Sequence, residues 1–188
     1  MEFTKQEIKE IAISVLVITF IFSFPRIERF PVYLIVVITA FLFHELAHKF
    51  IARKFGCAAF YKMWYPGIII ALLITFASFG NFKFISPGAV VIYPYTFGRW
   101  GFRVVSLTTS EMGIIAFAGP ATNLLFALIF ALIPGEIGRV VALTNAWLAL
   151  FNLLPIKPLD GSKIILWKPW VWLTMFVISL VFIIFYLV

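Results

Sequence analysis

The sequence predicts an all-α polytopic membrane protein with about five to six transmembrane helices. Of its 188 residues, 63% are hydrophobic and 12% are charged, whereas soluble domains average about 45–50% apolar and about 25% charged residues. The mean hydropathy is +1.08, and the apolar residues gather in runs suited to a hydrocarbon core about 30 Å thick. These observations exclude a soluble globule. We expect a single membrane-embedded domain over residues 1–188, without a soluble appendage.

Five apolar runs are expected to cross the bilayer, and they cover residues 11–24, 31–51, 112–133, 140–155 and 170–188. The first run follows Lys5 and Lys9 but has no small-residue cleavage site, so we interpret it as a retained helix and not as a secretory signal. The last run is preceded by Trp167, Lys168 and Trp170, which are residue types typical of the membrane interface.

The segment between the second and third runs has a different character. Residues 67–79 are apolar but number only 13, a length typical of re-entrant or interfacial pieces. Residues 84–93 are rich in β-branched side chains and are broken near Pro87, Gly88 and Pro94, which favours short strands over helix. We therefore expect a re-entrant or β-hairpin insert after the second run.

The distribution of basic residues favours this insert. If residues 66–97 enter the membrane and return, twelve of the fifteen Lys and Arg residues lie on the side of the N-terminus. This count includes Lys83, whose alternative position is the tip of the insert, and the division stays uneven without it. If residues 67–79 cross instead, the division is seven to eight. Cytoplasmic loops carry the excess of positive charge, so we predict a multi-pass protein of the cell membrane with a cytoplasmic N-terminus. The net charge of +7 is explained by these flanks, and we expect no nucleic-acid partner.

Four ionisable side chains stand out because they lie in or beside apolar runs. They are His44, Glu45, His48 and Asp160. An ionisable group in hydrocarbon costs at least about 2.5–3.5 kcal/mol, so each one is a functional candidate. The single cysteine, Cys57, can form neither an internal disulfide nor a paired metal site.

The first three form the pattern His44-Glu45-Leu46-Ala47-His48 within the second run. On a helix, a spacing of four places both imidazoles on one face, where two nitrogens can bind one Zn²⁺. Glu45 lies about 100° around the helix axis from His44, adjacent to the metal as a general base must be. The alternative is a helix-end cluster that fits the pattern by chance, which an apolar span disfavours.

A third ligand must come from elsewhere, because a catalytic zinc takes three protein ligands and leaves one position for water. Asp160 is the only Asp in the chain, and no third His exists. Pro155 and Pro158 cannot continue helical hydrogen bonding, so the backbone is expected to unwind and turn this carboxylate inward. The alternative is a solvated carboxylate in a turn before Gly161. A re-entrant insert places all three ligands towards the cytoplasmic face.

Three motifs together resemble the site-two protease family of intramembrane zinc metalloproteases. They are the histidine motif, Gly119-Pro120-Ala121-Thr122-Asn123, and Asn152-x-x-Pro155-x-x-Pro158-Leu159-Asp160-Gly161. The resemblance covers a catalytic core of about residues 31–165. It implies that His44, His48 and Asp160 bind zinc, that Glu45 is the catalytic base, and that the substrate is a transmembrane segment of another protein. It also implies a hairpin after the zinc helix that pairs with an unwound substrate strand. The long apolar insert before Phe82 departs from the family pattern.

Two amides are candidates for binding substrate or a developing oxyanion, namely Asn123 and Asn152. Preorganised amide donors suit that task, while the alternative is hydrogen bonding between helices. Gly119 and Pro120 are expected to permit close packing or a kink. Asn145 is given a structural role.

The small inventory of polar residues excludes two other classes of intramembrane protease. An aspartyl intramembrane protease needs two membrane-embedded Asp residues, and a serine type needs a His beyond the metal pair, so both are excluded. A metal-ion transporter that uses the same His/Asp site remains an alternative, although transporters usually show repeats and several broken helices. An inactive membrane scaffold is a further alternative, which the presence of Glu45 disfavours.

Overall fold

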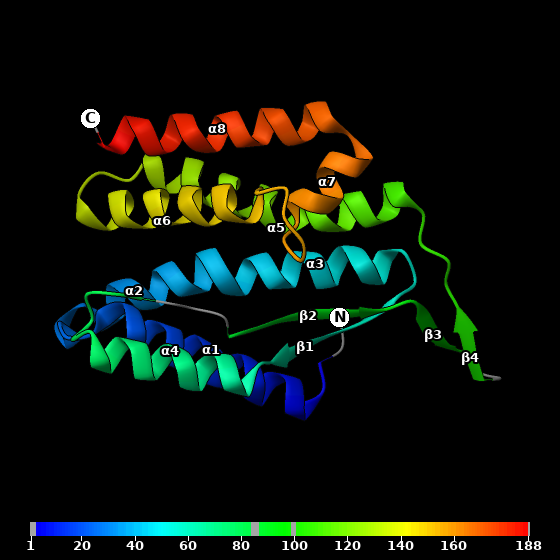
Figure 1. Cartoon of the computed structure of the whole chain (residues 1–188), viewed down its shortest axis with the longest axis horizontal. Coiled ribbons are helices and arrows are strands. Elements are labelled where there is room, and N and C mark those ends of the chain that lie inside the picture. The colour runs from blue at the N-terminus through cyan, green and yellow to red at the C-terminus, as the bar shows by residue number, and fades with distance from the viewer. Residues whose placement is uncertain (1–2, 84–86, 99–100, 188) are drawn as a thin grey trace.

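The structure is a computed structural model that describes residues 3–83, 87–98 and 101–187. Its long helices run roughly along one axis (Figure 1). They are α1 (Lys5–Ser23), α2 (Phe30–Val37), α3 (Phe43–Lys54), α4 (Tyr65–Ala77), α5 (Thr109–Ala131), α6 (Glu136–Asn152) and α8 (Pro169–Leu187), and the short α7 (Gly161–Trp167) precedes α8. A 3₁₀ turn (Ile27–Arg29) leads into α2, and a π-helical turn (Ile38–Leu42) joins α2 to α3. The four strands are β1 (Ala58–Met63), β2 (Gly88–Tyr93), β3 (Tyr95–Gly98) and β4 (Gly101–Val104).

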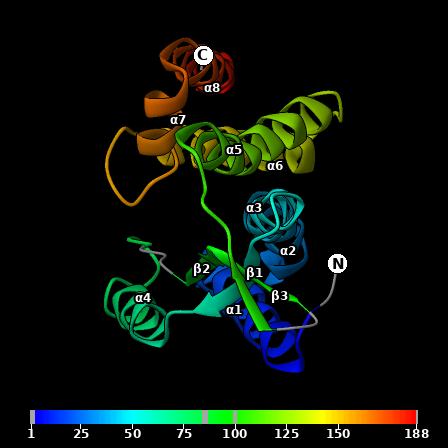
Figure 2. The same ribbon diagram turned by 90° about the vertical axis from the view of Figure 1, so that its right-hand side faces the viewer.

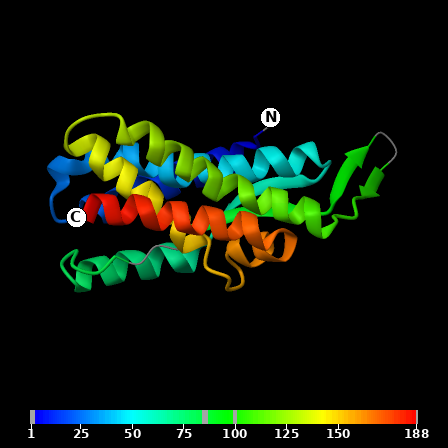
Figure 3. The ribbon, with the colours of Figure 1, turned by 90° about the horizontal axis from the view of Figure 1, so that it is seen from above.

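Viewed along the long axis, the molecule divides into two groups of elements (Figure 2). Helices α5 to α8 form one group, and α1 to α4 with the β1–β2 hairpin form the other. Helix α5 packs against α3, α6 and α7, so it joins the two groups. Figure 3 shows α4 along one flank of the molecule.

Three helical segments of the described chain are long and apolar enough to cross a membrane, and they are Ile27–Lys54, Thr109–Ala131 and Pro169–Tyr186. The predicted runs 11–24 and 140–155 form helices α1 and α6, but neither helix is both long enough and apolar enough to count as a candidate span. Helix α1 carries four charged residues in its first two turns, and α6 has 17 residues that include Glu136 and Arg139. Composition and length therefore support a membrane protein with three candidate spans, and the count of five to six is not reached on these measures.

The segment after α3 forms a hairpin of strands β1 and β2, and the sequence predicted strand structure for the second of these. Strands β1 and β2 pair antiparallel, from Ala58 opposite Tyr93 to Met63 opposite Gly88. The Trp64 N–H donates to the Pro87 carbonyl oxygen (2.8 Å), so the chain that leaves through α4 returns to its starting point. The strand expected over residues 84–93 is confirmed from Gly88 onwards, while residues 84–86 lie outside the described part.

The outer edge of β1 is closed by carboxylates of α1. The Tyr61 N–H donates to Glu7 Oε1 (2.9 Å), and the Met63 N–H donates to Glu10 Oε2 (2.9 Å). Glu7 also forms a buried ion pair with Lys49 of α3. Backbone groups at a strand edge are otherwise left without partners. Helix α1 supplies partners to these two N–H groups of β1.

Basic residues gather unevenly at the two ends of the helices. At one end, Arg29 pairs with Glu136 (3.3 Å) and Arg139 donates to the Tyr186 carbonyl (3.0 Å). Lys83 lies near this end as well, because its ammonium contacts the C-terminal turns of α1 through the Phe22 carbonyl. Of the two positions predicted for Lys83, the structure therefore shows the tip of the insert and not the side of the N-terminus, since α4 carries the chain along α1 to the far end. Arg99, counted in the same prediction, lies outside the described residues.

Candidate metal centre

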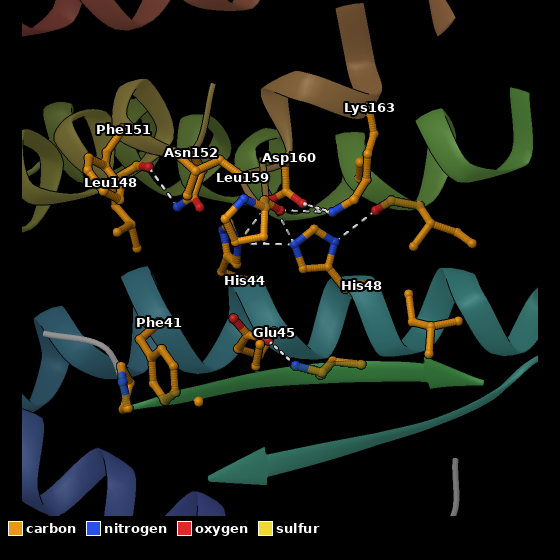
Figure 4. Close-up of a pocket in the computed structure, with 18 of the residues that line it drawn as sticks. Phe41, His44, Glu45, His48, Leu148, Phe151, Asn152, Leu159, Asp160 and Lys163 are labelled. Carbon is orange, nitrogen blue, oxygen red and sulfur yellow. Dashed lines mark hydrogen bonds and ion pairs between the residues drawn. The ribbon is translucent and has the colours of Figure 1, made fainter. Parts of the chain in front are cut away.

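Helix α3 presents its two histidines on one face. His44 and His48 are both buried, and their Nε2 atoms lie 3.0 Å apart. This proximity follows from their spacing of four residues, which is about one helical turn. The imidazoles project from α3 towards the loop that follows α6 (Figure 4).

The third candidate ligand, Asp160, lies in the segment between α6 and α7. Helix α6 stops at Asn152 and α7 begins at Gly161, so the backbone is non-helical through the proline-containing segment between them, as the sequence predicted. Asp160 is buried, and its Oδ2 lies 3.1 Å from His48 Nε2 and 3.5 Å from His44 Nε2. The following Gly161 is required sterically, because a Cβ there would lie 2.1 Å from the Leu153 carbonyl oxygen. The carboxylate is thus turned onto the histidine pair (Figure 4).

Hydrogen bonds fix the tautomers of both imidazoles. His48 Nδ1 lies 2.8 Å from the Ile115 carbonyl oxygen, which can only accept, so this nitrogen carries the proton. His44 Nδ1 lies 2.6 Å from Asn123 Oδ1. The Nδ2 of Asn123 donates to the Ala40 carbonyl (2.8 Å), which fixes its Oδ1 towards His44. In both neutral rings, Nε2 therefore presents a lone pair to the centre.

This donor set fits a zinc ion. Tetrahedral zinc with ligand bonds of about 2.0–2.1 Å places its ligand atoms about 3.3–3.4 Å apart. The three atoms here are separated by 3.0, 3.1 and 3.5 Å, and they belong to the His/His/Asp group able to hold a metal in the described chain. With both rings neutral and protonated on Nδ1, two imidazole lone pairs and a carboxylate converge on one point. A cation relieves their mutual repulsion.

Gly119 of α5 allows the imidazoles to approach this helix. A Cβ at this position would lie 2.3 Å from His48 Nε2 and 2.6 Å from His44 Cε1. Close packing, the role expected for Gly119, is therefore confirmed, and the partners are the two imidazoles themselves.

Glu45 lies on the other side of α3, facing β2 (Figure 4). The Val90 N–H donates to Glu45 Oε2 (2.7 Å). Tyr61, which is opposite Val90 in the hairpin, directs its own N–H away to Glu7. Tyr61 and Val90 thus form a non-hydrogen-bonded pair, in which the backbone groups of both residues point outwards. The outer edge of β2 therefore faces Glu45.

A cavity of about 880 Å³ connects these groups, and it is lined by α1, α3, β2, the start of α5, the end of α6 and the Asp160 loop. Both histidines, Glu45 and Asp160 line it. Asn152 also lines the cavity, and its Nδ2 donates to the Leu148 carbonyl of its own helix (3.0 Å). Asn123 is instead buried behind His44, with its carbonyl oxygen and both amide N–H groups engaged.

Two residues at the centre were not singled out from the sequence. Lys163 lines the cavity, lies 3.7 Å from Asp160 Oδ1 and donates to the Pro158 carbonyl (3.2 Å). In the sequence, its position three residues after Asp160 could have indicated that Lys163 lies at the site. Asn145, which was given a structural role, contacts Asn123 directly (3.1 Å). The signal for Asn145 was a second amide in an apolar run.

Comparison with known proteins agrees with this geometry. The chain is 40% identical over 181 residues to a "putative zinc metalloprotease" of Methanocaldococcus jannaschii, covering 90% of this chain and 88% of that protein. It is 27% identical over 162 residues to a protein of Bacillus subtilis with the same description, covering 77% of this chain and 72% of that one. No family model and no solved structure matches the chain. The expected cofactor, zinc, is supported both by these relatives and by the His/His/Asp group. The chain belongs to the family of zinc metalloproteases that these relatives represent.

Proposed function

We propose that this protein is an intramembrane zinc metalloprotease of the site-two protease type, which hydrolyses peptide bonds in transmembrane segments of other membrane proteins. The observation that carries the proposal is the convergence of His44, His48 and Asp160 in a chain dominated by apolar helices. Glu45 lines the same cavity. Ionisable side chains are costly in an apolar setting, so their convergence at one point supports a functional site.

Each residue of the site has its own role in the proposed hydrolysis. His44, His48 and Asp160 would hold the zinc ion, which as a Lewis acid makes water a nucleophile near neutral pH. Glu45 accepts a proton from the attacking water, whose oxygen bonds to the scissile carbonyl carbon. The carbon–nitrogen bond then breaks, and Glu45 returns the proton to the leaving amine. Asn152 lines the same cavity and would donate its second amide N–H to the substrate carbonyl.

The outer edge of β2 supports an extended substrate, which would replace Glu45 Oε2 as the partner of the Val90 N–H. Val90 directs its backbone groups outwards, and the alternation of an antiparallel pair gives Gly88 and Ile92 the same orientation. These residues line the cavity. A transmembrane helix that unwinds beside the metal can pair with this edge, which satisfies its backbone groups within the membrane.

The finer membrane arrangement follows from the same proposal. Helices α1 and α6 cross the bilayer beside the three candidate spans, which gives five crossings, within the expected five to six. The whole chain is one membrane domain, with its catalytic core over about residues 31–165. The end of the molecule that carries Lys54 and Lys168 faces the cytoplasm, since it holds most of the basic residues.

The proposal is tested by reconstituting the purified protein in liposomes with a synthetic single-span peptide whose apolar helix contains Gly and Asn. Mass spectrometry is expected to detect cleavage within the span, and zinc analysis is expected to give about one ion per chain. The variant Glu45→Gln is expected to keep its zinc and lose cleavage, while the matched exposed variant Glu28→Gln retains both. Cleavage by Glu45→Gln would refute the role of the base. Zinc uptake into the liposomes without cleavage would instead favour the transporter alternative.

A further inference from the structure

We propose that Asn145 is a positioning residue for the metal centre, which sets the tautomer and orientation of His44 through Asn123. The inference rests on the proposed zinc site. The residues involved are Thr39 of the π-helical turn, His44 of α3, Asn123 of α5 and Asn145 of α6, and all four are buried.

The first step is the contact between the two amides. The Nδ2 of Asn123 donates to the Ala40 carbonyl (2.8 Å) and to Asn145 Oδ1 (3.1 Å). Both N–H groups of Asn123 are therefore used, and its Oδ1 is directed to His44 Nδ1 (2.6 Å). Asn145 supplies one of the two acceptors that keep the Asn123 amide in this orientation.

The second step fixes Asn145 itself. Its Nδ2 donates to the Val141 carbonyl (2.9 Å) and to Thr39 Oγ1 (3.1 Å). The single proton of the Thr39 hydroxyl is directed to the neighbouring carbonyls of Ile35 (2.9 Å) and Val36 (3.0 Å), so its oxygen lone pairs are left to accept. Because a carbonyl can only accept, the direction of every bond in the chain is determined. His44 donates to Asn123, Asn123 to Asn145, and Asn145 to Thr39.

The third step is that these hydrogen bonds link the helices that position the metal ligands. Helix α3 carries two of the metal-binding residues, while α6 leads into the loop that carries Asp160. Asn145 of α6 bonds both to the π-helical turn that continues into α3 and to α5. The same residue thus aligns the helix that precedes Asp160 with the helix that carries the histidines.

A metal-bound imidazole depends on such a partner. The partner of the second ring nitrogen holds the tautomer that leaves the other nitrogen free to bind, and loss of such partners typically lowers metal affinity about 10–100-fold. Asn145 acts one bond further away, so we expect its loss to weaken zinc binding about tenfold. His48 provides a built-in comparison, because its Nδ1 donates to the Ile115 carbonyl, independently of Asn145.

The first measurement is the zinc dissociation constant of the detergent-purified full chain, obtained by competition with a chromophoric chelator. Asn145→Ala is expected to raise the constant about tenfold. The matched control is Ser179→Ala in α8, a buried side chain that bonds only within its own helix in the described structure. This control is expected to bind zinc as the wild type does. If Asn145→Ala does not fold, Thr39→Val removes the next acceptor with little change of shape, and an increase in the same direction is expected.

The second measurement is made without metal and reads the tautomers directly. Since the chain has only two histidines, selective ¹⁵N labelling of histidine gives two sets of ring-nitrogen signals. In the wild type, both rings are expected to carry the proton on Nδ1. In Asn145→Ala, the His44 signals are expected to move towards a mixture with Nε2–H, while those of His48 stay unchanged.

Wild-type zinc affinity and unchanged His44 signals in Asn145→Ala would overturn the proposal, as would an equal loss of affinity in Ser179→Ala. If the wild-type protein binds no zinc, the proposed function fails. The tautomer measurement still decides the role of Asn145 in that case, because it needs no metal.

Discussion

Gly119→Ala is expected to disable the metal centre by steric displacement. The added Cβ would lie 2.3 Å from His48 Nε2 and 2.6 Å from His44 Cε1, whereas carbon atoms in ordinary contact are about 3.5–4.0 Å apart. One or both imidazoles must therefore retreat by about 1 Å. Zinc–ligand distances vary by only about 0.2 Å between sites, so at least one nitrogen is lost as a ligand. We expect zinc affinity to fall by at least on the order of 100-fold, more than for loss of an outer partner.

The assay is chelator competition on the purified protein, and Gly113→Ala is the matched control. A Cβ at Gly113 of the same helix would lie 2.2 Å from Trp167 Cβ, so this variant is overpacked to a similar degree away from the ligands. Each variant is expected to lose about 1–3 kcal/mol of stability, but only Gly119→Ala should lose zinc. Wild-type zinc affinity in Gly119→Ala, or an equal loss in Gly113→Ala, would refute the steric explanation.

Three further predictions concern the rest of the molecule. Lys49→Met leaves the buried Glu7 carboxylate without its cation and is expected to cost about 3–5 kcal/mol of unfolding free energy. The double variant with Glu7→Leu should recover part of this loss in thermal unfolding, and equal stability of the single and double variants would contradict the pairing. Burial, with a smaller contribution from the charge of Glu111, raises the pKa of the Cys57 thiol, so alkylation should be slow at neutral pH and accelerate only as the pH rises. Rapid labelling of the folded protein at neutral pH would show that Cys57 is accessible. Two single-cysteine variants, Lys168→Cys and Arg139→Cys, can be made in a Cys57→Ala background. They are expected to react with membrane-impermeant reagents from opposite sides of the membrane, and labelling of both variants from the same side would exclude the proposed orientation.

The residues of the centre could be predicted because each is chemically unusual in its setting. Two histidines at helical spacing in an apolar run, and the only aspartate of the chain beside two prolines, are conspicuous in the sequence. The structure brings these three side chains together. Their common depth could be inferred from the distribution of basic residues, which stays uneven whether or not Lys83 is counted.

The supporting contacts could not be predicted in the same way. Asn145 in a span is equally consistent with ordinary bonding between helices, and its contact with Asn123 depends on the register of α5 against α6. Strand β1 is short and contains two alanines and Lys62, so it lacks the alternation that marks a strand. The π-helical turn before α3 has no recognised signature in the sequence. These features arise from tertiary packing and not from local preference.

The carboxylates of α1 have a consequence for how the hairpin can assemble. A two-stranded ribbon normally exposes two edges that can recruit further chains. Here Glu7 and Glu10 already take the Tyr61 and Met63 N–H groups of β1, so a third strand cannot be added on that flank. Any extension of the sheet is confined to the flank of Glu45. Copies of this protein crowded in one bilayer are thereby kept from joining hairpin to hairpin through β1.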